Sequence, residues 1–260
     1  MEYIHYATID STNNEAKRLI SSGEIKENTC LTAERQSAGR GRQGKSFFSP
    51  DTGLYMTVVF PVDRPISSQV TVTTRTACAV AEAIEECTGK QAGIKWVNDI
   101  YINNKKCCGI LCEAVNDYEQ GRLKYIIIGI GVNIYTREWP EELRNIAGSL
   151  VDGENEEDIE ISGIKDKLCR SIAEKLETWI FKTSEQEFLE YYKGHSIVLG
   201  KMITFIENGE SKEGCAVDID ENGGLVVKLS EGTGVPDSDE KSEALYKTLS
   251  SGEISVKVHM

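Results

Sequence analysis

Apolar positions along the chain follow two different spacings, which separate predicted strands from predicted helices. Short apolar runs in the N-terminal half predict six strands, at Tyr3–Ala7, Thr29–Ala33, Leu54–Phe60, Ile94–Ile102, Lys106–Val115 and Lys124–Ile134. Asn103 and Asn104 stand between two of these runs and predict a hairpin turn. The pattern therefore predicts a sheet whose strands are largely joined by local connections.

Helical spacing marks four further segments. Apolar side chains recur at this spacing around residues 12–23, 77–84, 164–180 and 184–192. Thr12 and Glu15 have the spacing of a capping box that begins the first helix, and Gly23 is expected to end it. Gly89 has the position of a C-cap for the second helix. Ser184 and Glu187 predict a capping box for the fourth.

After Gly194 the pattern changes to short β segments. Five are predicted, at Met202–Glu207, Cys215–Ile219, Gly224–Leu229, Ala244–Leu249 and Ile254–Val258. Five short strands in about sixty residues predict a small β-barrel that follows a body of strands and helices. We therefore expect two domains, residues 1–194 and 195–260.

Charge narrows the class of protein. The chain has 260 residues, 42 acidic and 29 basic side chains, and a net charge of −13. Residues 152–160 hold six acids and no base, which is typical of a solvated loop. A chain this acidic is not expected to coat DNA or RNA, so only a local basic patch could bind a phosphate.

Eight cysteines do not form a metal or disulfide pattern. No C-x-x-C occurs, and the three histidines are far apart in the sequence. The N-terminus lacks the basic and apolar regions of a signal peptide, and the longest apolar stretch, Tyr125–Ile134, is too short to span a bilayer. We expect a reduced, soluble, cytoplasmic protein without a structural metal.

A basic, glycine-rich loop is the first candidate for chemistry. Residues 39–44 match G-x-G-x-x-G and residues 39–46 also fit the P-loop spacing G-x-x-x-x-G-K-S, but no helix follows at once, as both motifs require, and no kinase motifs occur downstream. Residues 34–46 nevertheless carry a net charge of +3. Glycines allow close backbone approach and arginines bind phosphate or carboxylate oxygens, so the loop is a candidate anion site. The alternative is a solvated basic loop or the tip of a β-hairpin.

Three other clusters place polar side chains at element ends. Lys95–Asp99 follows an apolar run, and its alternative interpretation is a β-turn. Asp10–Asn13 stands at a predicted helix start, where hydroxyls and amides either cap the helix or contact a ligand. Residues 129–133 place two glycines and Asn133 in a strand, which implies close approach by another backbone or a ligand.

In this order the clusters resemble the biotin protein ligase family. The matching segments are DSTN at 10–13, ERQSAGRGRQG at 34–44, KWVNDIY at 95–101, KCCGIL at 106–111, GIGVN at 129–133 and GEIS at 252–255. The resemblance covers nearly the whole chain. It implies an α+β fold, with a mixed, largely antiparallel sheet packed with helices as in class II synthetases, followed by an SH3-like β-barrel.

The resemblance also implies an activity and site residues. Family members activate biotin with ATP, accompanied by Mg²⁺, and transfer it from biotinyl-5′-adenylate to one lysine of a biotin carboxyl carrier domain of a carboxylase. The implied biotin-binding residues are Ser11, Thr12, Asn13, Gln36, Arg40, Gly41, Arg42 and Lys106. The implied nucleotide contacts are Arg40, Arg42, Phe47, Asn133, Glu253 and Lys257. The implied catalytic residues are Arg42, Lys106, Lys95 and Asp99.

Elementary electrostatics agrees with these roles. The carboxylate of biotin and the α-phosphate of ATP are both anions, so cations are needed to bring them together and to stabilise charge on the phosphoryl oxygens. The reactive adenylate must be kept from water, and closure of the glycine-arginine loop is the expected gate. The chain differs from the family at Val97, usually Pro, at Phe47, often Trp, and at Lys257, commonly Arg.

Two alternatives of different kinds remain at this point. One is a lipoate-type ligase on the related fold, and the other is a biotin or nucleotide sensor without catalysis. The ligase motifs begin by Tyr3, so we expect no preceding DNA-binding domain and no DNA binding. A homodimer through a sheet edge, such as Lys106–Val115 or Lys124–Ile134, stays open because edge strands are not visible in sequence.

Overall fold

A seven-stranded mixed sheet forms the body of the protein. The structure is a computed structural model that describes residues 1–65, 69–151, 161–207, 209–229, 245–250 and 254–256. The strands are β1 (Glu2–Ile9), β2 (Thr29–Gln36), β3 (Gly53–Pro65), β4 (Gly93–Lys95), β5 (Asp99–Ile102), β6 (Lys105–Asp117) and β7 (Arg122–Asn133). Their order is β1-β2-β3-β7-β6-β5-β4, with only the β1–β2 pair parallel. The predicted mixed, largely antiparallel α+β fold is therefore confirmed.

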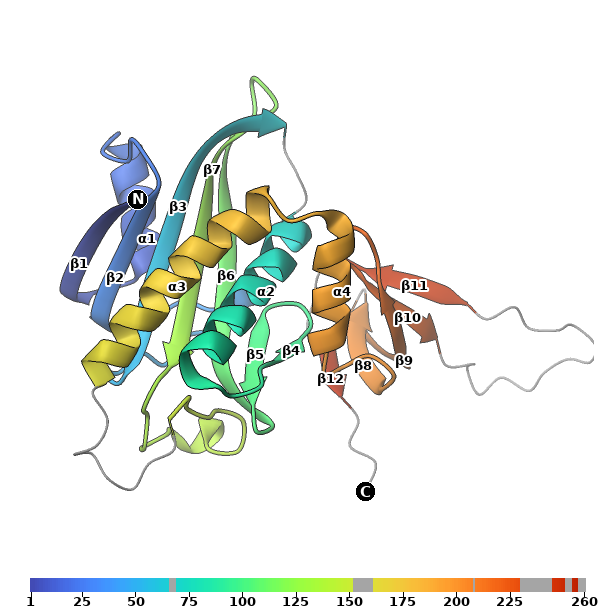
Figure 1. The fold of residues 1–260 in the computed structure, drawn as a ribbon. Coiled ribbons are helices and arrows are strands. Elements are labelled where there is room, and N and C mark those ends of the chain that lie inside the picture. The colour runs from blue at the N-terminus through green and yellow to red at the C-terminus, as the bar shows by residue number, and fades with distance from the viewer. Residues whose placement is uncertain (66–68, 152–160, 208, 230–244, 251–253, 257–260) are drawn as a thin grey trace, which may run out of the picture.

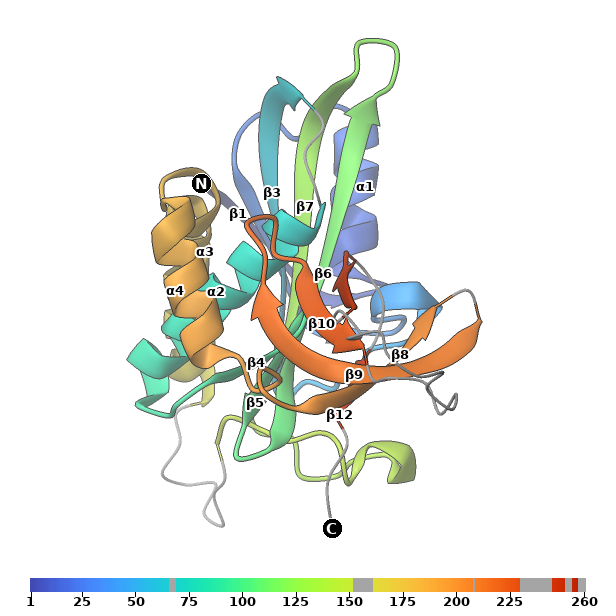
Figure 2. The same ribbon diagram turned by 90° about the vertical axis from the view of Figure 1, so that its right-hand side faces the viewer.

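Helices cover the two faces of this sheet unequally (Figure 2). α1 (Thr12–Ser21) packs on one face, where Ala16 meets Leu31, Val59 and Ile127. The other face carries α2 (Gln69–Thr88) and α3 (Ile161–Phe181), which share the main core with the strands. Successive strand residues point to opposite faces, so Ile126 and Ile128 enter the main core while Ile127 points toward α1. The short α1 leaves part of its own face open.

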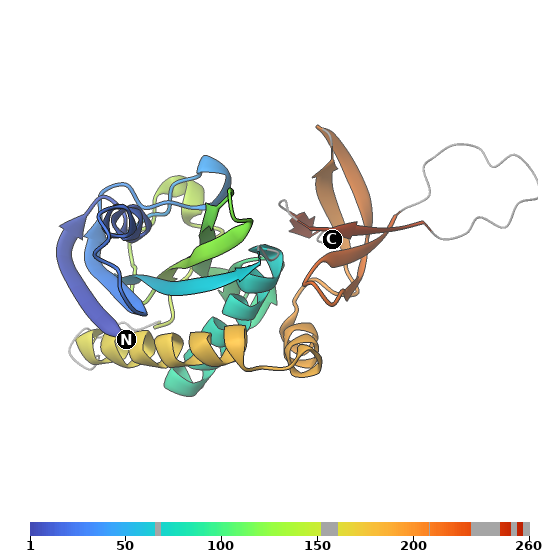
Figure 3. The same ribbon diagram turned by 90° about the horizontal axis from the view of Figure 1, so that it is seen from above.

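A second sheet follows α4 (Glu185–His195) and lies beside the body (Figures 1 and 3). Its strands are β8 (Met202–Glu207), β9 (Glu210–Ile219), β10 (Leu225–Leu229), β11 (Tyr246–Leu249) and β12 (Ile254–Val256). The order is β11-β10-β9-β8-β12, all antiparallel. The five predicted strands are present, and in the described part of the chain they form an open sheet with β11 and β12 at its edges. The division at residue 194 stays a prediction.

Hydrogen bonds join this second sheet to the body. Trp96 Nε1 donates to the carbonyl oxygen of Gly223 at 2.9 Å, and Thr71 Oγ1 donates to that of Asn222 at 2.9 Å. Lys193 Nζ of α4 lies 2.6 Å from Asp218 Oδ1 of β9. The first two contacts place the β9–β10 turn against the body.

Several local predictions are confirmed. Asn103 and Asn104 have φ values of 49° and 61° and form the turn between β5 and β6. Gly89 has a φ of 68° and its amide donates to the Glu85 carbonyl at 2.8 Å, as expected of a C-cap. Ser184 and Glu187 form the predicted capping box of α4. The acidic segment at 152–160 lies outside the described residues.

Two local predictions are wrong. The capping box at Thr12 and Glu15 does not form, because Ser11 is the N-cap, without a side-chain capping bond, and Glu15 instead accepts from Arg18 and Tyr6. The single strand predicted at Ile94–Ile102 is two strands, β4 and β5, which pair with each other around a turn at residues 96–98. The turn considered as the alternative is present at residues 96–98, with Asp99 already in β5.

The two helix starts allow a direct comparison of stability. We expect Ser184→Ala to lower the free energy of unfolding by about 1 kcal/mol, because the substitution removes the hydroxyl that accepts from the Glu187 amide. Ser11→Ala removes no capping bond and is expected to change stability less. Urea denaturation of both variants measures the difference. Equal losses would show that the capping box does not stabilise α4.

Candidate functional site

A cleft opens on the α1 face of the sheet, where the start of α1 meets β6, β7 and the glycine-rich loop. Its empty space is about 420 Å³, part of which is open to solvent. Its lining residues come from five parts of the chain: Ser11, Thr12, Asn13, Gln36, Arg40, Gly41, Arg42, Phe47, Asn98, Gly109, Ile110, Leu111, Gly129, Ile130 and Gly131. Eight of the residues predicted from the sequence to bind biotin or nucleotide therefore line one cleft.

Three glycines form the floor of the cleft. Gly109 of β6 pairs with Gly131 of β7, and Gly129 follows on the same face. A Cβ at Gly131 would lie 2.5 Å from the Phe47 ring, and one at Gly129 would lie 2.1 Å from Asn13 Oδ1. Any side chain at these positions would displace Phe47 or Asn13, so the missing side chains allow both residues to reach the sheet.

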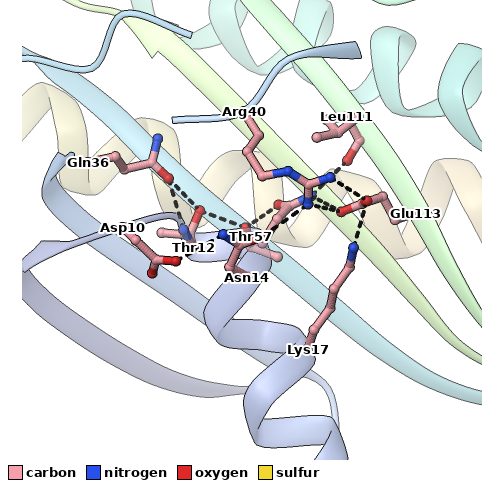
Figure 4. A network of polar contacts seen from close by, with 10 residues as sticks. Asp10, Thr12, Asn14, Lys17, Gln36, Arg40, Thr57, Leu111 and Glu113 are labelled. Atoms are coloured by element: carbon pink, nitrogen blue, oxygen red, sulfur yellow. Dashed lines mark hydrogen bonds and ion pairs between the residues drawn. The ribbon is translucent and has the colours of Figure 1, made fainter. Parts of the chain in front are cut away.

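A chain of hydrogen bonds holds the start of α1 against the strands (Figure 4). Gln36 Oε1 accepts from the Thr12 amide at 2.9 Å, and Gln36 Nε2 donates to Ser49 Oγ at 3.0 Å. The buried Thr57 hydroxyl lies 2.7 Å from Asn13 Oδ1 and 2.8 Å from Thr12 Oγ1. These contacts position donors and acceptors at one end of the cleft, as a small polar ligand requires.

The glycine-rich loop folds back on itself as a tight hairpin. Arg40 forms a β-bridge with Ser46, and the Gly41 amide donates to the Lys45 carbonyl at 2.7 Å. Gln43 and Gly44 adopt φ values of 53° and 76° at the tip, where a glycine is favoured. The loop is thus both the hairpin tip considered as the alternative and a wall of the cleft.

The two arginines of the loop are held by different partners. Arg40 Nη1 and Nη2 each donate to Glu113 at 3.2 Å, and Nη1 also donates to Asn14 Oδ1 at 3.1 Å. Arg42 Nη1 donates to Asn98 Oδ1 at 3.2 Å, and Asn98 is itself held by the Ile110 carbonyl at 2.9 Å. A carboxylate therefore neutralises Arg40, whereas Arg42 is bound by a neutral amide at this contact.

Glu113 binds several donors besides Arg40. Lys17 Nζ lies 2.7 Å from Oε1, and Asn13 Nδ2 donates to Oε2 at 3.0 Å. Burial by itself would raise the pKa of the Glu113 carboxyl, but the bonds from Lys17 and Asn13 and the nearby Arg40 hold this pKa below its usual value. Glu113 is therefore a carboxylate at neutral pH.

Lys106 reaches the edge of the cleft through a β-bulge. Ile100 pairs with Cys108 and Tyr101 pairs with Lys106, so Cys107 is the extra residue in β6. Because of this bulge Lys106 faces the same side as Gly109, and its Cε lies 3.5 Å from where a Gly109 Cβ would stand. Lys106 Nζ also lies 2.6 Å from Asp99 Oδ1. The structure thus brings Lys106 and Asp99 together next to Phe47.

Two further predicted residues, Lys95 and Asn133, are not among the residues that line the cleft. Lys95 Nζ lies 5.9 Å from the centre of the Tyr101 ring. Asn133 is buried, and its amide donates to the carbonyl oxygens of Lys106 at 3.4 Å and Gly148 at 3.2 Å. Glu253 and Lys257 lie outside the described residues.

Sequence reasoning missed three residues of the site. Asn98 stands inside the KWVND segment, but only Lys95 and Asp99 were expected to act there. Thr57 and Glu113 lie inside predicted strands, outside the recognised motifs. A polar residue in an apolar strand was the available signal, because such a side chain must find a partner when the strand is covered.

No described carboxylate cluster offers a metal cage. Across the described ranges, no group of three or more His, Cys, Asp or Glu side chains is arranged to hold a metal ion. Asp99 and Glu113, which contact residues of the site, are each paired with a lysine. The same ranges contain no helix that is long and apolar enough to cross a membrane.

Comparisons with known proteins agree with this geometry. Residues 6–133 match the biotin/lipoate A/B protein ligase family, and residues 198–257 match the biotin protein ligase C-terminal domain. The bifunctional ligase/repressor BirA of Bacillus subtilis is 30% identical over 232 residues, which cover 88% of this chain and 70% of that protein. The biotin–[acetyl-CoA-carboxylase] ligase of Mycobacterium tuberculosis is 26% identical over 230 residues, 86% of this chain and 82% of that protein.

A solved structure extends the likeness to the whole fold. The biotin protein ligase of Aquifex aeolicus, in complex with biotin and ATP, superposes with a TM-score of 0.75 at 27% identity and covers 98% of both chains. The fold and the matches to known proteins identify a ligase in which the body is followed by a C-terminal sheet. The chain belongs to the biotin protein ligase family.

The glycine floor can be tested by stability alone. We expect Gly129→Ala to lower the free energy of unfolding by about 2 kcal/mol, because the new methyl group would push Asn13 away from Thr57 and Glu113. Gly194→Ala is the control, since a Cβ there meets nothing within 4 Å outside its own helix, and the higher helix propensity of alanine should leave this variant at least as stable as wild type. Urea denaturation distinguishes the two variants. An equally stable Gly129→Ala protein would contradict the close approach.

A pH dependence is expected at the start of α1. The Arg18 guanidinium and the Asn14 amide hold the pKa of Asp10 well below its usual value, although burial opposes them. This stabilisation is present above the ordinary carboxyl pKa of about 4 and is lost as the pH falls through the lowered folded-state pKa. Asp10→Asn should lower the free energy of unfolding at pH 7 by at most about 1 kcal/mol. The loss is small because water partly screens the ion pair between Asp10 and Arg18.

The check is denaturation of both proteins from pH 7 to pH 3. The gap in unfolding free energy between wild type and Asp10→Asn should narrow toward the acid end. A gap that stays constant over this range would show that the Asp10 carboxylate does not stabilise α1.

Proposed function

We propose that this ligase activates biotin with ATP to biotinyl-5′-adenylate and transfers biotin to a specific lysine of a biotin carboxyl carrier domain. The observation that supports this most strongly is the glycine-floored cleft, which joins a polar pocket at α1 to cations from the glycine-rich loop. The polar end suits the ureido group of biotin, and the cationic side suits a carboxylate and a phosphate.

We assign biotin recognition to the residues at the start of α1. Ser11, Thr12 and Asn13 are buried and line the cleft, and Gln36 fixes the Thr12 amide. Hydroxyl and amide groups can both donate and accept, which matches the N–H and C=O groups of the ureido ring. Leu111, which lies on the same face of β6 as Gly109, and the glycine floor leave room for the rest of the bicyclic ring and the valeryl chain.

In the first step the biotin carboxylate attacks the α-phosphorus of ATP and pyrophosphate leaves. Arg42 and Lys106 act as catalytic residues by offsetting repulsion between the two anions and stabilising charge on the phosphoryl oxygens. Arg40 and Gly41 belong to the loop that covers the adenylate. Mg²⁺ arrives with the triphosphate, whose oxygens and water supply its ligands.

The nucleotide is proposed to lie toward Phe47. The Phe47 ring lies over Gly109 and Gly131 and offers a flat apolar surface for adenine. Both amide hydrogens of Asn133 are committed to backbone carbonyls, so a contact from Asn133 to the nucleotide would use its Oδ1. Glu253 and Lys257 keep their proposed role in binding nucleotide from the C-terminal sheet.

In the second step the amine of the acceptor lysine attacks the acyl carbon of the mixed anhydride and releases AMP. We assign Lys95 and Asp99 to this region, with Asp99 oriented by its ion pair with Lys106. No covalent enzyme intermediate is needed. The acceptor is proposed to be a carboxylase carrier domain, in a reaction that takes place in the cytoplasm.

Two other kinds of partner, DNA and a second copy of the chain, were considered from the sequence. The net charge of −13 opposes binding to DNA, so we propose a ligase without operator binding. β7, which contains Lys124–Ile134, is paired with β3 on one side and β6 on the other, so it is not a sheet edge. A homodimer through the Lys106–Val115 segment of β6 stays a proposal that sedimentation can test. The lipoate alternative is not favoured, since the C-terminal match and the named relatives are biotin ligases.

Biotin-dependent exchange of labelled pyrophosphate into ATP, followed by label transfer to a carrier domain, tests the function. We expect exchange with biotin and little with lipoate, and transfer only to a carrier that keeps its acceptor lysine. Lys106→Met should lower the exchange rate by about 100-fold, as loss of a preorganised charge does. Lys182→Met, which removes an exposed lysine paired with Glu177, is the control.

Three results would contradict this assignment. A protein that exchanges faster with lipoate than with biotin would be a lipoate-type ligase. Binding of biotin without exchange would make it a sensor. Normal exchange by Lys106→Met would remove Lys106 from the first step while leaving the overall reaction intact.

A further inference from the structure

Glu113 joins three parts of the chain that border the cleft. It lies in β6, on the same face as Gly109 and Leu111, two residues beyond the last cleft-lining position of that strand. Its two carboxylate oxygens accept from Arg40 of the glycine-rich loop and from Lys17 and Asn13 of α1 (Figure 4). No motif resemblance singled out this position.

The contact between Glu113 and Arg40 has the geometry of a clamp. Both terminal nitrogens of Arg40 reach the carboxylate, each at 3.2 Å, and only 19% of the Glu113 side chain is exposed. A bidentate, charge-assisted pair of this kind fixes direction as well as distance. Arg40 Nη1 also donates to Asn14, so the same guanidinium ties the loop to both β6 and α1.

Lys17 and Asn13 make the carboxylate a fixed anchor. Lys17 Nζ at 2.7 Å adds a second cation, and Asn13 Nδ2 at 3.0 Å holds Oε2 from the cleft side. With these partners Glu113 stays charged and oriented whether or not the loop is in contact. The anchor therefore belongs to the rigid sheet and helix, and the loop is the part that can be released.

We propose that Glu113 is a positioning residue of the ligase reaction, which clamps Arg40 and thereby holds the glycine-rich loop over the adenylate. The inference rests on the proposed function for its substrate, but the contact between Glu113 and Arg40 is made by the described residues themselves. Glu113 touches no reacting atom. Its role is to slow the opening of the loop, and so to keep the mixed anhydride from dissociating or meeting water before the acceptor lysine arrives.

The first experiment needs no ligand. Trypsin cleaves after Arg40, Arg42 and Lys45, and cleavage requires opening of the hairpin that pairs Arg40 with Ser46 and Gly41 with Lys45. Glu113→Gln keeps the size of the side chain and removes its charge, so we expect cleavage in this loop to become about tenfold faster, the loss expected for a charge-assisted bond. Glu82→Gln is the matched control.

Glu82 suits this control because its carboxylate also accepts from two donors, Lys175 and the Trp179 indole, at 2.8 and 2.6 Å. These residues lie between α2 and α3, on the opposite face of the sheet. The control should lose stability by a similar amount without faster cleavage in the loop. Unchanged cleavage of Glu113→Gln, or equal acceleration in both variants, would overturn the clamp.

The second experiment measures adenylate retention. Preformed enzyme–adenylate complex is separated from free ligand, and loss of labelled biotinyl-adenylate is followed over time. Glu113→Gln should release it about tenfold faster than wild type. The variant Arg40→Gln should behave alike, and the double variant should be no faster than either single one, because both substitutions break the same contact.

The outcomes separate the clamp from the proposed function. Two effects that multiply in the double variant would show that Glu113 does not act through Arg40. If wild type forms no adenylate but Glu113→Gln opens the loop to trypsin, the proposed function fails and the clamp stands. Normal adenylate formation with unchanged release and unchanged cleavage in Glu113→Gln would refute the clamp alone.

Discussion

The architecture of the site depends on the absence of side chains at Gly109, Gly129 and Gly131. These glycines lie on neighbouring antiparallel strands and on one face, so together they form a bare floor on the sheet. Asn13 enters over Gly129 and Phe47 crosses Gly131, which brings the start of α1 and the end of the glycine-rich loop into one cleft. The sheet forms the floor of the cleft, and α1 and the glycine-rich loop provide its polar and charged side chains.

Each cation beside that floor has a partner that directs it. Arg40 is paired with a carboxylate, Arg42 with an amide, and Lys106 with Asp99. Cations gathered for two anionic substrates repel one another before the substrates arrive, and these partners offset that repulsion. The acidic net charge of the chain is thus compatible with a cationic cleft, because the charges that matter are placed within a few ångströms.

The fold was predictable where a local interaction decides it. Gly89, the Asn103–Asn104 turn and the Ser184 capping box depend on residues close in sequence, and all three formed as expected. The prediction at Thr12 was wrong because a distant residue, Gln36, holds its amide and hydroxyl. The prediction of one strand at Ile94–Ile102 was wrong because the chain turns there to pair β4 with β5.

The sequence by itself determined the family, the α+β class and most residues of the cleft, since motifs and periodicity are properties of neighbouring positions. Only the tertiary structure decided how these residues meet. The bulge at Cys107 turns Lys106 toward Gly109, and the turn at residues 96–98 brings Asn98 to Arg42. Glu113 was invisible to motif reasoning because its partners lie about 70 to 100 positions away in the chain. Contacts of that separation exist only once the sheet has set the register of its strands.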